Sequence, residues 1–228
     1  MDVEPLCRSI SAWKVWSWHE KKCMQIAISG NIGAGKTELT RLLARHYGYR
    51  AVYGVPEENP YLESFSEDMR RWSFNMMVHM LYANVRQITE LQQEGKSFIR
   101  DRSLFDDVAV FAPNLQDMGL MTTRDLTTYT QLFELLYGLV PKPDLMIYVR
   151  GDVPTLIRHI QKRGRENERS IRLDYLTNLN NRYERWAENY EGKMVVVDCD
   201  ELDFVERRED LGTVIEKIDA QFNGLFVN

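Results

Sequence analysis

The stretch MQIAISGNIGAGKTELTRLLARHYG (residues 24–48) decides the fold. Its first six residues form an apolar run typical of a buried strand, and Leu39, Leu42 and Leu43 recur at the spacing of a helix. Between them lies GNIGAGKT, which matches the pattern G-x-x-x-x-G-K-[ST] in the strand–loop–helix context that gives this pattern its meaning. The sequence therefore predicts a phosphate-binding loop at residues 30–37.

The glycine-rich loop has the composition of an anion site. Its glycines let the backbone wrap closely around an anion, and backbone N–H groups and the helix N-terminus supply partial positive charge. Lys36 is expected to reach the β- and γ-phosphates of a nucleoside triphosphate, and Thr37 to offer its hydroxyl to Mg²⁺. A plain glycine turn is the alternative, and the full pattern disfavours it. The expected nucleotide-binding residues are those of the whole loop: Gly30, Asn31, Ile32, Gly33, Ala34, Gly35, Lys36 and Thr37.

Other apolar runs predict the rest of the fold. Further strands are expected at 49–53, 96–103, 144–150 and 193–200. Helices are expected at 60–94 (as two helices), 104–111, 122–139, 153–163, 173–190 and 211–222, with an irregular segment at 112–122. Strands that alternate with helices favour a doubly wound parallel sheet. We expect an α/β fold with a five-stranded parallel sheet, helices on both faces, and one domain over residues 24–228.

Composition narrows the class of protein. The chain has 228 residues and a formal net charge of −5, so it lacks a basic field for a nucleic-acid polymer, and we expect no such partner. Its three cysteines form no CxxC pair, which favours free thiols in a reducing compartment. Because no apolar run could span a bilayer and residues 1–22 lack the pattern of a secretion signal, we expect a cytoplasmic protein without a membrane partner. Residues 1–23 are expected to be a poorly ordered tail, with a docking arm as the alternative.

A charged cluster ends the third predicted strand. Asp101, Arg102 and Ser103 fall at the edge of the sheet where ligands bind in open α/β folds. The alternative makes Asp101 a helix N-cap and Arg102 its partner.

A run of cations, RHIQKRGRENE, occupies residues 158–168. In a chain with a phosphate-binding loop, this run fits a short arginine-rich lid over about residues 158–170. The guanidinium groups of Arg163 and Arg165 are expected to neutralise charge on a transferred phosphoryl group. A solvated helix end is the alternative.

Together these motifs resemble the deoxynucleoside kinase family, particularly the bacterial deoxyadenosine/deoxyguanosine kinases. The resemblance is carried by GNIGAGKT, ENPYL followed by RRWSFN, DRS, FAPNLQDMGLMTTRD, PDLMIYVR, KRGRE with DYL shortly after, and VVVDCDELDF. It implies a P-loop kinase in which ATP, with Mg²⁺, phosphorylates the 5′-hydroxyl of a small-molecule deoxynucleoside. It also implies a role in nucleotide salvage and a homodimer formed through helices.

The resemblance implies roles for individual residues. Lys36 and Arg102 belong to the catalytic set, with Arg102 orienting the carboxylate that accepts the hydroxyl proton and contacting the substrate. Asp101 would assist Mg²⁺, and Glu166 would lie on the substrate side. Residues 198–204 would lie along the adenine of ATP.

Four positions depart from the family pattern. The family's proton-accepting glutamate falls on Gly54, and its sugar-binding tyrosine falls on Ser66. A glutamine that reads the nucleobase edge falls on Met77, and a basic residue two helical turns later falls on Asn84. In the family, all four positions contact or act on the nucleoside, whereas the motifs that bind phosphate are unchanged in this chain. This pattern favours a different or less discriminated acceptor.

Two carboxylates follow the vacant glutamate position. Either Glu57 or Glu58 takes over as the general base, with Glu57 preferred, or both cap the next helix, where acidic residues are ordinary. A general base contributes about 10²–10⁴ in rate, so its loss slows phosphoryl transfer without forbidding it.

Two other functions stay open. A monophosphate kinase resembling thymidylate kinase would need additional arginines near the second strand, and Arg50, Arg70 and Arg71 are present without a distinguishing pattern. An ATP-binding protein with a degenerate nucleoside pocket is the non-enzyme alternative.

Other polar residues carry weaker expectations. The neighbouring Asp106 and Asp107 fit an ordinary acidic first turn of a helix, with a role at the acceptor site as the alternative. His159 has no cysteine or carboxylate at metal-ligand spacing, and we expect no zinc site in the chain.

Overall fold

The structure is a computed structural model that describes residues 23–54, 59–164 and 172–223. Its five strands are β1 (Gln25–Gly30), β2 (Arg50–Val52), β3 (Phe98–Asp101), β4 (Leu145–Arg150) and β5 (Met194–Asp198). They form one parallel sheet in the order β2-β3-β1-β4-β5. The predicted five-stranded parallel sheet is confirmed. Residues 1–22, which make up almost all of the predicted tail, lie outside the described residues.

The helices of the described residues largely match the predicted ones. They are α2 (Lys36–Tyr47), α3 (Leu62–Glu67), α4 (Met69–Gln93), η2 (Asp106–Phe111), α5 (Ala112–Asp117), α6 (Thr123–Tyr137), α7 (Val153–Arg163), α8 (Leu173–Glu188) and α9 (Arg208–Asn223). The prediction of an irregular segment at 112–122 was wrong for its first half, which is α5. Pro113 lies in the first turn of α5, where its missing N–H has no intrahelical partner to lose. The preceding η2 is a wide π-helix that leads directly into it.

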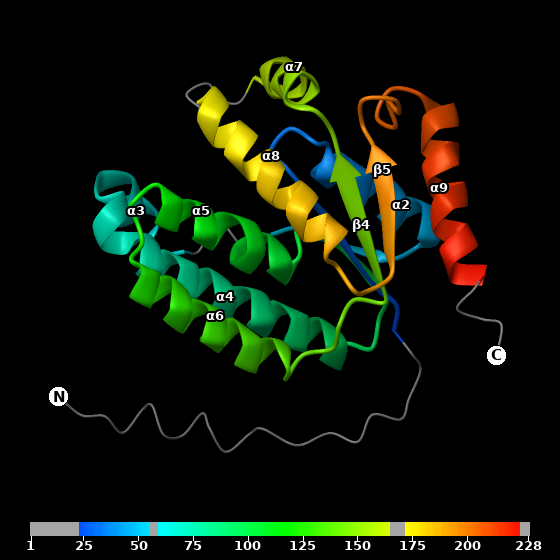
Figure 1. Cartoon of the computed structure of the whole chain (residues 1–228). Coiled ribbons are helices and arrows are strands. Elements are labelled where there is room, and N and C mark those ends of the chain that lie inside the picture. Colours follow the sequence, from blue (N-terminus) through cyan, green and yellow to red (C-terminus); the bar gives the residue numbers. More distant parts are fainter. Residues whose placement is uncertain (1–22, 55–58, 165–171, 224–228) are drawn as a thin grey trace.

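Helices cover both faces of the sheet (Figure 1). On one face α2 and α9 pack against alternate residues of the central strands, such as Ile26, Ile28 and Ile147, which are fully buried. On the other face Tyr148 of β4 packs against Tyr183 of α8. The long helix α4 packs with α5 and α6 into a separate apolar cluster beside the sheet. Each fully buried aliphatic side chain contributes about 1.5–3 kcal/mol, so these two layers hold the sheet in place.

The strand order places the glycine-rich loop at the centre of the molecule. Strand β1 lies between β3 and β4: β2 and β3 are on one side of it and β4 and β5 on the other, so the chain crosses β1 once, between β3 and β4. Ligands of open α/β sheets bind at this switch point, outside the carboxyl ends of the strands. All five strands end at the same edge of the sheet, and α7 lies beyond that edge (Figure 1).

Candidate functional site

The glycine-rich loop is a tight turn between β1 and α2. A turn hydrogen bond joins the Ala34 N–H to the Asn31 carbonyl oxygen at 3.2 Å. At the start of the loop, a Cβ on Gly30 would lie 2.5 Å from the carbonyl oxygen of Val149, and Gly30 has a φ of +151°. No other residue fits there, so Gly30 lets the loop approach β4 closely. The predicted loop conformation is confirmed by the positive φ angles of its glycines.

Lys36 lies inside the loop and is almost fully buried. Its Nζ donates to the carbonyl oxygen of Asn31 at 2.9 Å. Burial, together with the nearby cations Arg102 and Arg163, lowers the pKa of Lys36 to about 8 against the opposing effects of Asp101 and Asp106. Arg102 and Arg163 thus lie close enough to Lys36 to affect its pKa, and an anion in the loop would interact favourably with all three cations.

Thr37 and Asp101 form an oxygen pair beside the lysine. The Thr37 hydroxyl donates to Asp101 Oδ2 at 2.5 Å, while Oδ1 of the same carboxylate is buried with no hydrogen-bond partner. A hydroxyl and a carboxylate oxygen are ligands that suit Mg²⁺, which takes its remaining ligands from water and substrate phosphates. Within the described part of the chain no group of three or more His, Cys, Asp or Glu side chains could hold a metal alone. The residues present therefore fit Mg²⁺ carried in with a nucleotide.

Arg102 has a strained backbone. Its φ is +74°, and it is the one non-glycine residue with a positive φ among those described. Its N–H donates to the carbonyl oxygen of Ile28 at 2.9 Å, and its guanidinium lies 4.9 Å from the ring centre of Phe111. Such a conformation costs about 1–3 kcal/mol and persists where surrounding contacts determine it, which indicates a functional position.

The alternative that made Asp101 a helix cap is wrong. Asp101 ends β3, and its carboxylate bonds Thr37 instead of a helix terminus. The cap of the following helix is Ser103: the Ser103 N–H donates to Asp106 Oδ2 at 2.6 Å, and the Phe105 N–H donates to the Ser103 hydroxyl at 3.2 Å.

Asp106 is not simply the acidic residue in the first turn of a helix that the sequence suggested, because its carboxylate links several segments of the chain. It is buried and accepts hydrogen bonds from the Ser29 hydroxyl at 2.9 Å and from the Tyr183 hydroxyl at 2.6 Å, in addition to those from Ser103. It therefore ties β1, the segment after β3, and α8 together beneath Arg102. The spacing S-x-x-D of a capping box was the signal that could have identified it.

Asp107 belongs to a second buried polar group, on the side of the sheet that faces α4. Asn84 donates to Asp107 Oδ2 at 2.8 Å, and Arg100 donates to the side-chain oxygen of Asn84. Burial raises the pKa of Asp107 to about 6, although Arg102 and Arg100 oppose that shift. No prediction from the sequence included Arg100. The signal that could have identified it is an arginine in the middle of a strand that is covered on both faces.

The other positions predicted to handle the nucleoside lie on or near α3 and α4. Ser66 is exposed, and its hydroxyl donates to the carbonyl oxygen of Leu62. Met77 is 2% exposed, within the apolar cluster of α4, α5 and α6. At Gly54 an added Cβ would lie 3.9 Å from the Asp101 carbonyl oxygen and 4.0 Å from Arg102 Cδ, so this position directly adjoins the site and has room for a side chain.

Several predicted site residues fall on parts of the chain that are not described. These are Glu57 and Glu58, Arg165, and Glu166, which lie in residues 55–58 and 165–171. The described part of the predicted lid is helical, because α7 runs to Arg163 and Gly164 ends it in the left-handed conformation.

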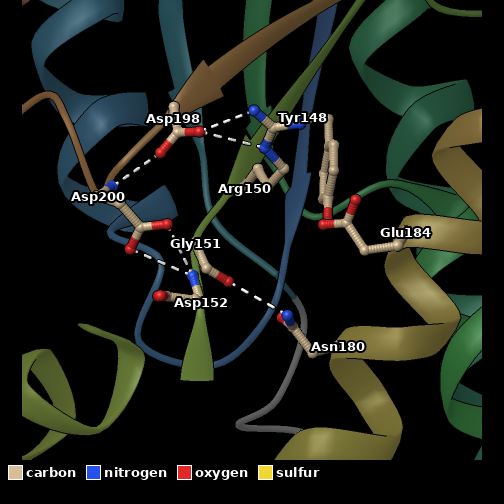
Figure 2. A network of polar contacts seen from close by, with 8 residues as sticks. All are labelled: Tyr148, Arg150, Gly151, Asp152, Asn180, Glu184, Asp198 and Asp200. Atoms are coloured by element: carbon tan, nitrogen blue, oxygen red, sulfur yellow. Dashed lines mark hydrogen bonds and ion pairs between the residues drawn. The ribbon is translucent and has the colours of Figure 1, made fainter. Parts of the chain in front are cut away.

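The carboxyl ends of β4 and β5 are fixed by a polar network (Figure 2). Arg150 donates to Asp198 at 2.8 Å, the Asp200 N–H donates to Asp198 at 2.9 Å, and the Asp152 N–H donates to Asp200 at 2.9 Å. The network holds the start of residues 198–204, the segment that the resemblance places along adenine. At its end, the Phe204 ring lies 3.1 Å from where a Cβ of Gly35 would be, so the segment reaches the phosphate loop.

Asn31 has a structural role that the sequence did not indicate. Its amide donates to the Leu176 carbonyl oxygen at 3.1 Å and to Asn180 Oδ1 at 3.0 Å, and its Oδ1 accepts from the Ile32 N–H at 2.8 Å. The side chain is 2% exposed. The side chain therefore fastens the loop to α8, while the carbonyl oxygen of Asn31 accepts from Lys36 Nζ.

Comparisons with known proteins agree with this geometry. Residues 26–223 match the family model described as deoxynucleoside kinase. A deoxyadenosine/deoxycytidine kinase of Bacillus subtilis is 31% identical over 203 residues, covering 88% of this chain and 94% of that protein. A deoxyadenosine kinase of Lactobacillus acidophilus is 35% identical over 207 residues, covering 86% and 95%. The solved structure of deoxyadenosine kinase from M. mycoides with bound dATP has a TM-score of 0.73 and 30% identity, and covers 86% of this chain and all of that one.

Proposed function

The chain belongs to the deoxynucleoside kinase family, and we propose that it transfers the γ-phosphoryl group of ATP to the 5′-hydroxyl of a deoxynucleoside. Nucleoside phosphorylation is the activity of its relatives, and the chain is an enzyme of that class. ATP as donor, Mg²⁺ as metal and the 5′-hydroxyl as acceptor are the finer parts of the proposal.

One observation carries this proposal: Lys36 lies buried inside the phosphate loop, with the cations Arg102 and Arg163 near enough to lower its pKa. The repulsion among these cations contributes to the low pKa of Lys36, so the site is built for a group with several negative charges. Backbone amides at the start of α2 add donors, because the first N–H groups of a helix have no intrahelical partner. A triphosphate tail satisfies both features.

The described residues support a division of roles on the donor side. Lys36 binds the β- and γ-phosphates, and Arg163 neutralises charge on the phosphoryl group as the bond to the β-phosphate breaks. Arg102 orients the carboxylate that accepts the proton of the hydroxyl group. Thr37 and Asp101 would hold Mg²⁺, which when bound would supply further positive charge to the phosphates. Arg165, which lies outside the described residues, is the other arginine proposed to neutralise charge on the phosphoryl group.

On the acceptor side, we propose Glu57 as the residue that takes the proton from the 5′-hydroxyl while the hydroxyl oxygen attacks phosphorus. Gly54, which adjoins Arg102 in the structure, cannot supply a carboxylate. Ser66, Met77, Asn84 and Glu166 are the proposed nucleoside-facing positions. The side-chain amide of Asn84 already forms hydrogen bonds with Asp107 and Arg100.

One assay tests the proposed function. Purified protein is incubated with labelled ATP, Mg²⁺ and a panel of deoxynucleosides and nucleoside monophosphates. Transfer to deoxynucleosides is the expected result. Transfer to monophosphates alone would identify a thymidylate-type kinase, and ATP binding without transfer would identify a protein whose nucleoside pocket has degenerated.

We also propose a homodimer formed through helices and a role in cytoplasmic nucleotide salvage. Apolar side chains that remain exposed on the helices beside the sheet support the dimer, since Tyr82 on α4 is 54% and Leu135 on α6 is 65% exposed. Light scattering on the purified chain gives its mass and tests the dimer.

None of the described helices is long and apolar enough to cross a membrane.

A further inference from the structure

Helix α7 packs directly onto the back of the phosphate loop at Gly33. A Cβ on this glycine would lie 2.6 Å from the carbonyl oxygen of Leu156 and 3.0 Å from Cγ1 of Ile160, and its φ is +87°. Leu156 and Ile160 are one helical turn apart, so a single face of α7 meets the loop. Only glycine allows the helix to approach this closely.

The same face of α7 makes one polar contact with the loop. His159 Nδ1 lies 2.9 Å from the carbonyl oxygen of Gly33. Because a carbonyl oxygen only accepts hydrogen bonds, Nδ1 carries the hydrogen in this contact. The histidine that the sequence left without a role therefore donates to the phosphate loop.

This hydrogen bond fixes the orientation of one peptide plane in the loop. The Gly33 carbonyl and the Ala34 N–H belong to the same planar peptide unit and point in opposite directions. The carbonyl is held by His159, and the N–H is held by the Asn31 carbonyl oxygen at 3.2 Å. The Asn31 oxygen also accepts from Lys36 Nζ, so the position of the lysine depends on the same turn.

We propose that His159 is a positioning residue for nucleotide binding: its Nδ1–H holds the Gly33–Ala34 peptide plane, and thereby the turn that places Lys36 and the loop amides around the phosphates. This inference rests on the proposed function only in that the ligand of the loop is ATP. It does not depend on which acceptor is phosphorylated.

The opposite side of the loop provides a contrast. There the Asn31 side chain is fully buried and makes three hydrogen bonds, two of them to α8, so removing it would disturb the fold itself. His159 is only half-buried and makes one such bond. Replacing His159 therefore carries a smaller risk to folding than replacing Asn31, and His159 is the residue to mutate.

The test compares three variants of the full-length protein by ATP titration calorimetry and by steady-state kinetics. His159→Ala removes the donor; His159→Asn places an amide N–H near the position of Nδ1; His159→Gln places it near Nε2 instead. Pro154→Ala, an exposed position on the same helix outside the predicted lid, is the matched control. Thermal unfolding of each variant checks its fold.

The proposal predicts that His159→Ala and His159→Gln raise both the dissociation constant and the KM for ATP about five- to tenfold, the worth of one hydrogen bond. His159→Asn should return them to within about twofold of the wild type, with the KM for the nucleoside little changed in every variant. Equal behaviour of the Asn and Gln variants, or ATP constants for His159→Ala within about twofold of the wild type, would overturn it. Wild-type protein that binds ATP but phosphorylates no nucleoside would contradict the proposed function and leave this comparison readable in the dissociation constants.

Discussion

The phosphate-binding and nucleoside-binding halves of the site are built differently. On the phosphate side, Lys36 and Thr37 begin α2, Asp101 ends β3 and Arg102 follows it, and the four lie close together. On the nucleoside side, the residues come from separate helices and loops, and the position expected to carry a carboxylate is Gly54.

The difference shows which parts of the site can vary. The phosphate side depends on backbone amides and on residues at strand ends, so its geometry is fixed by the sheet itself. The nucleoside side depends on side chains, and several of these can change together. For example, the side-chain amide of Asn84 donates to Asp107 and accepts from Arg100, so its hydrogen-bonding groups have partners within the protein. We therefore propose that the enzyme keeps a fixed donor site beside an altered acceptor site.

The largest effect on activity is expected from removing the charge of the lysine in the phosphate-binding loop. Lys36→Met keeps the length of the side chain but removes the charge, and should lower kcat/KM by about 10³-fold because charge at the transferred phosphoryl group is no longer neutralised. Radiometric transfer assays measure it. Lys217→Met, which removes an exposed lysine on α9, is the control and should leave activity unchanged. Loss of less than about tenfold in Lys36→Met would contradict the account.

The next effect tests the acceptor side. Glu57→Gln should lower kcat by about 10²-fold or more, because the general base is lost. Adding Gly54→Glu to that variant should restore much of the rate, since position 54 has room for a side chain beside Arg102. Pre-steady-state transfer rates measure both.

Gly54→Gln in the same background is the control, because it has the size of glutamate without its basicity. If Glu57→Gln keeps the wild-type rate while Gly54→Glu alone raises it, Glu57 is not the base and the wild-type enzyme works without one.

A smaller effect concerns the buried polar group at Asp107. Its pKa is raised to about 6 by burial, so the folded state binds a proton more tightly than the unfolded state, and stability is lost as pH rises through about 6. Asp107→Asn keeps an acceptor for Asn84 but never ionises. It should therefore raise the free energy of unfolding by about 3 kcal/mol near pH 7.5.

That gain should shrink as the pH is lowered and vanish near pH 4, as urea unfolding at several pH values would measure. Destabilisation near pH 7.5 would show instead that the buried Arg100 requires the charge of Asp107.

The smallest effect is expected at the rim of the donor site. Arg150 is 48% exposed, and its bond to Asp198 is screened by solvent. Arg150→Gln should change the free energy of unfolding by less than about 1 kcal/mol and leave the KM for ATP within about threefold. A tenfold rise in that KM would mean that the network of Figure 2 shapes the nucleotide site itself.

Much of the phosphate side could be predicted because its signals are local. The spacing of Gly30, Lys36 and Thr37 requires one backbone shape, and the end of a strand fixes where Asp101 lies. Contacts between distant segments gave no such signal. The hydrogen bond from Tyr183 to Asp106 joins residues 77 positions apart, and that from His159 to Gly33 joins residues 126 positions apart.

The helical elements show a further limit. The residues of α5 read as irregular because a proline and polar residues obscure the apolar spacing, yet η2 and packing against α6 make them helical. The role of Arg100 was hidden because its partner, Asn84, lies in a helix 16 residues earlier.

Calorimetric titration of Mg·ATP into the wild-type protein, without any nucleoside, tests the central claim most directly. The account predicts saturable heat with one nucleotide bound per chain, because the donor site is complete without the acceptor. Absence of heat at concentrations that saturate related kinases would contradict it.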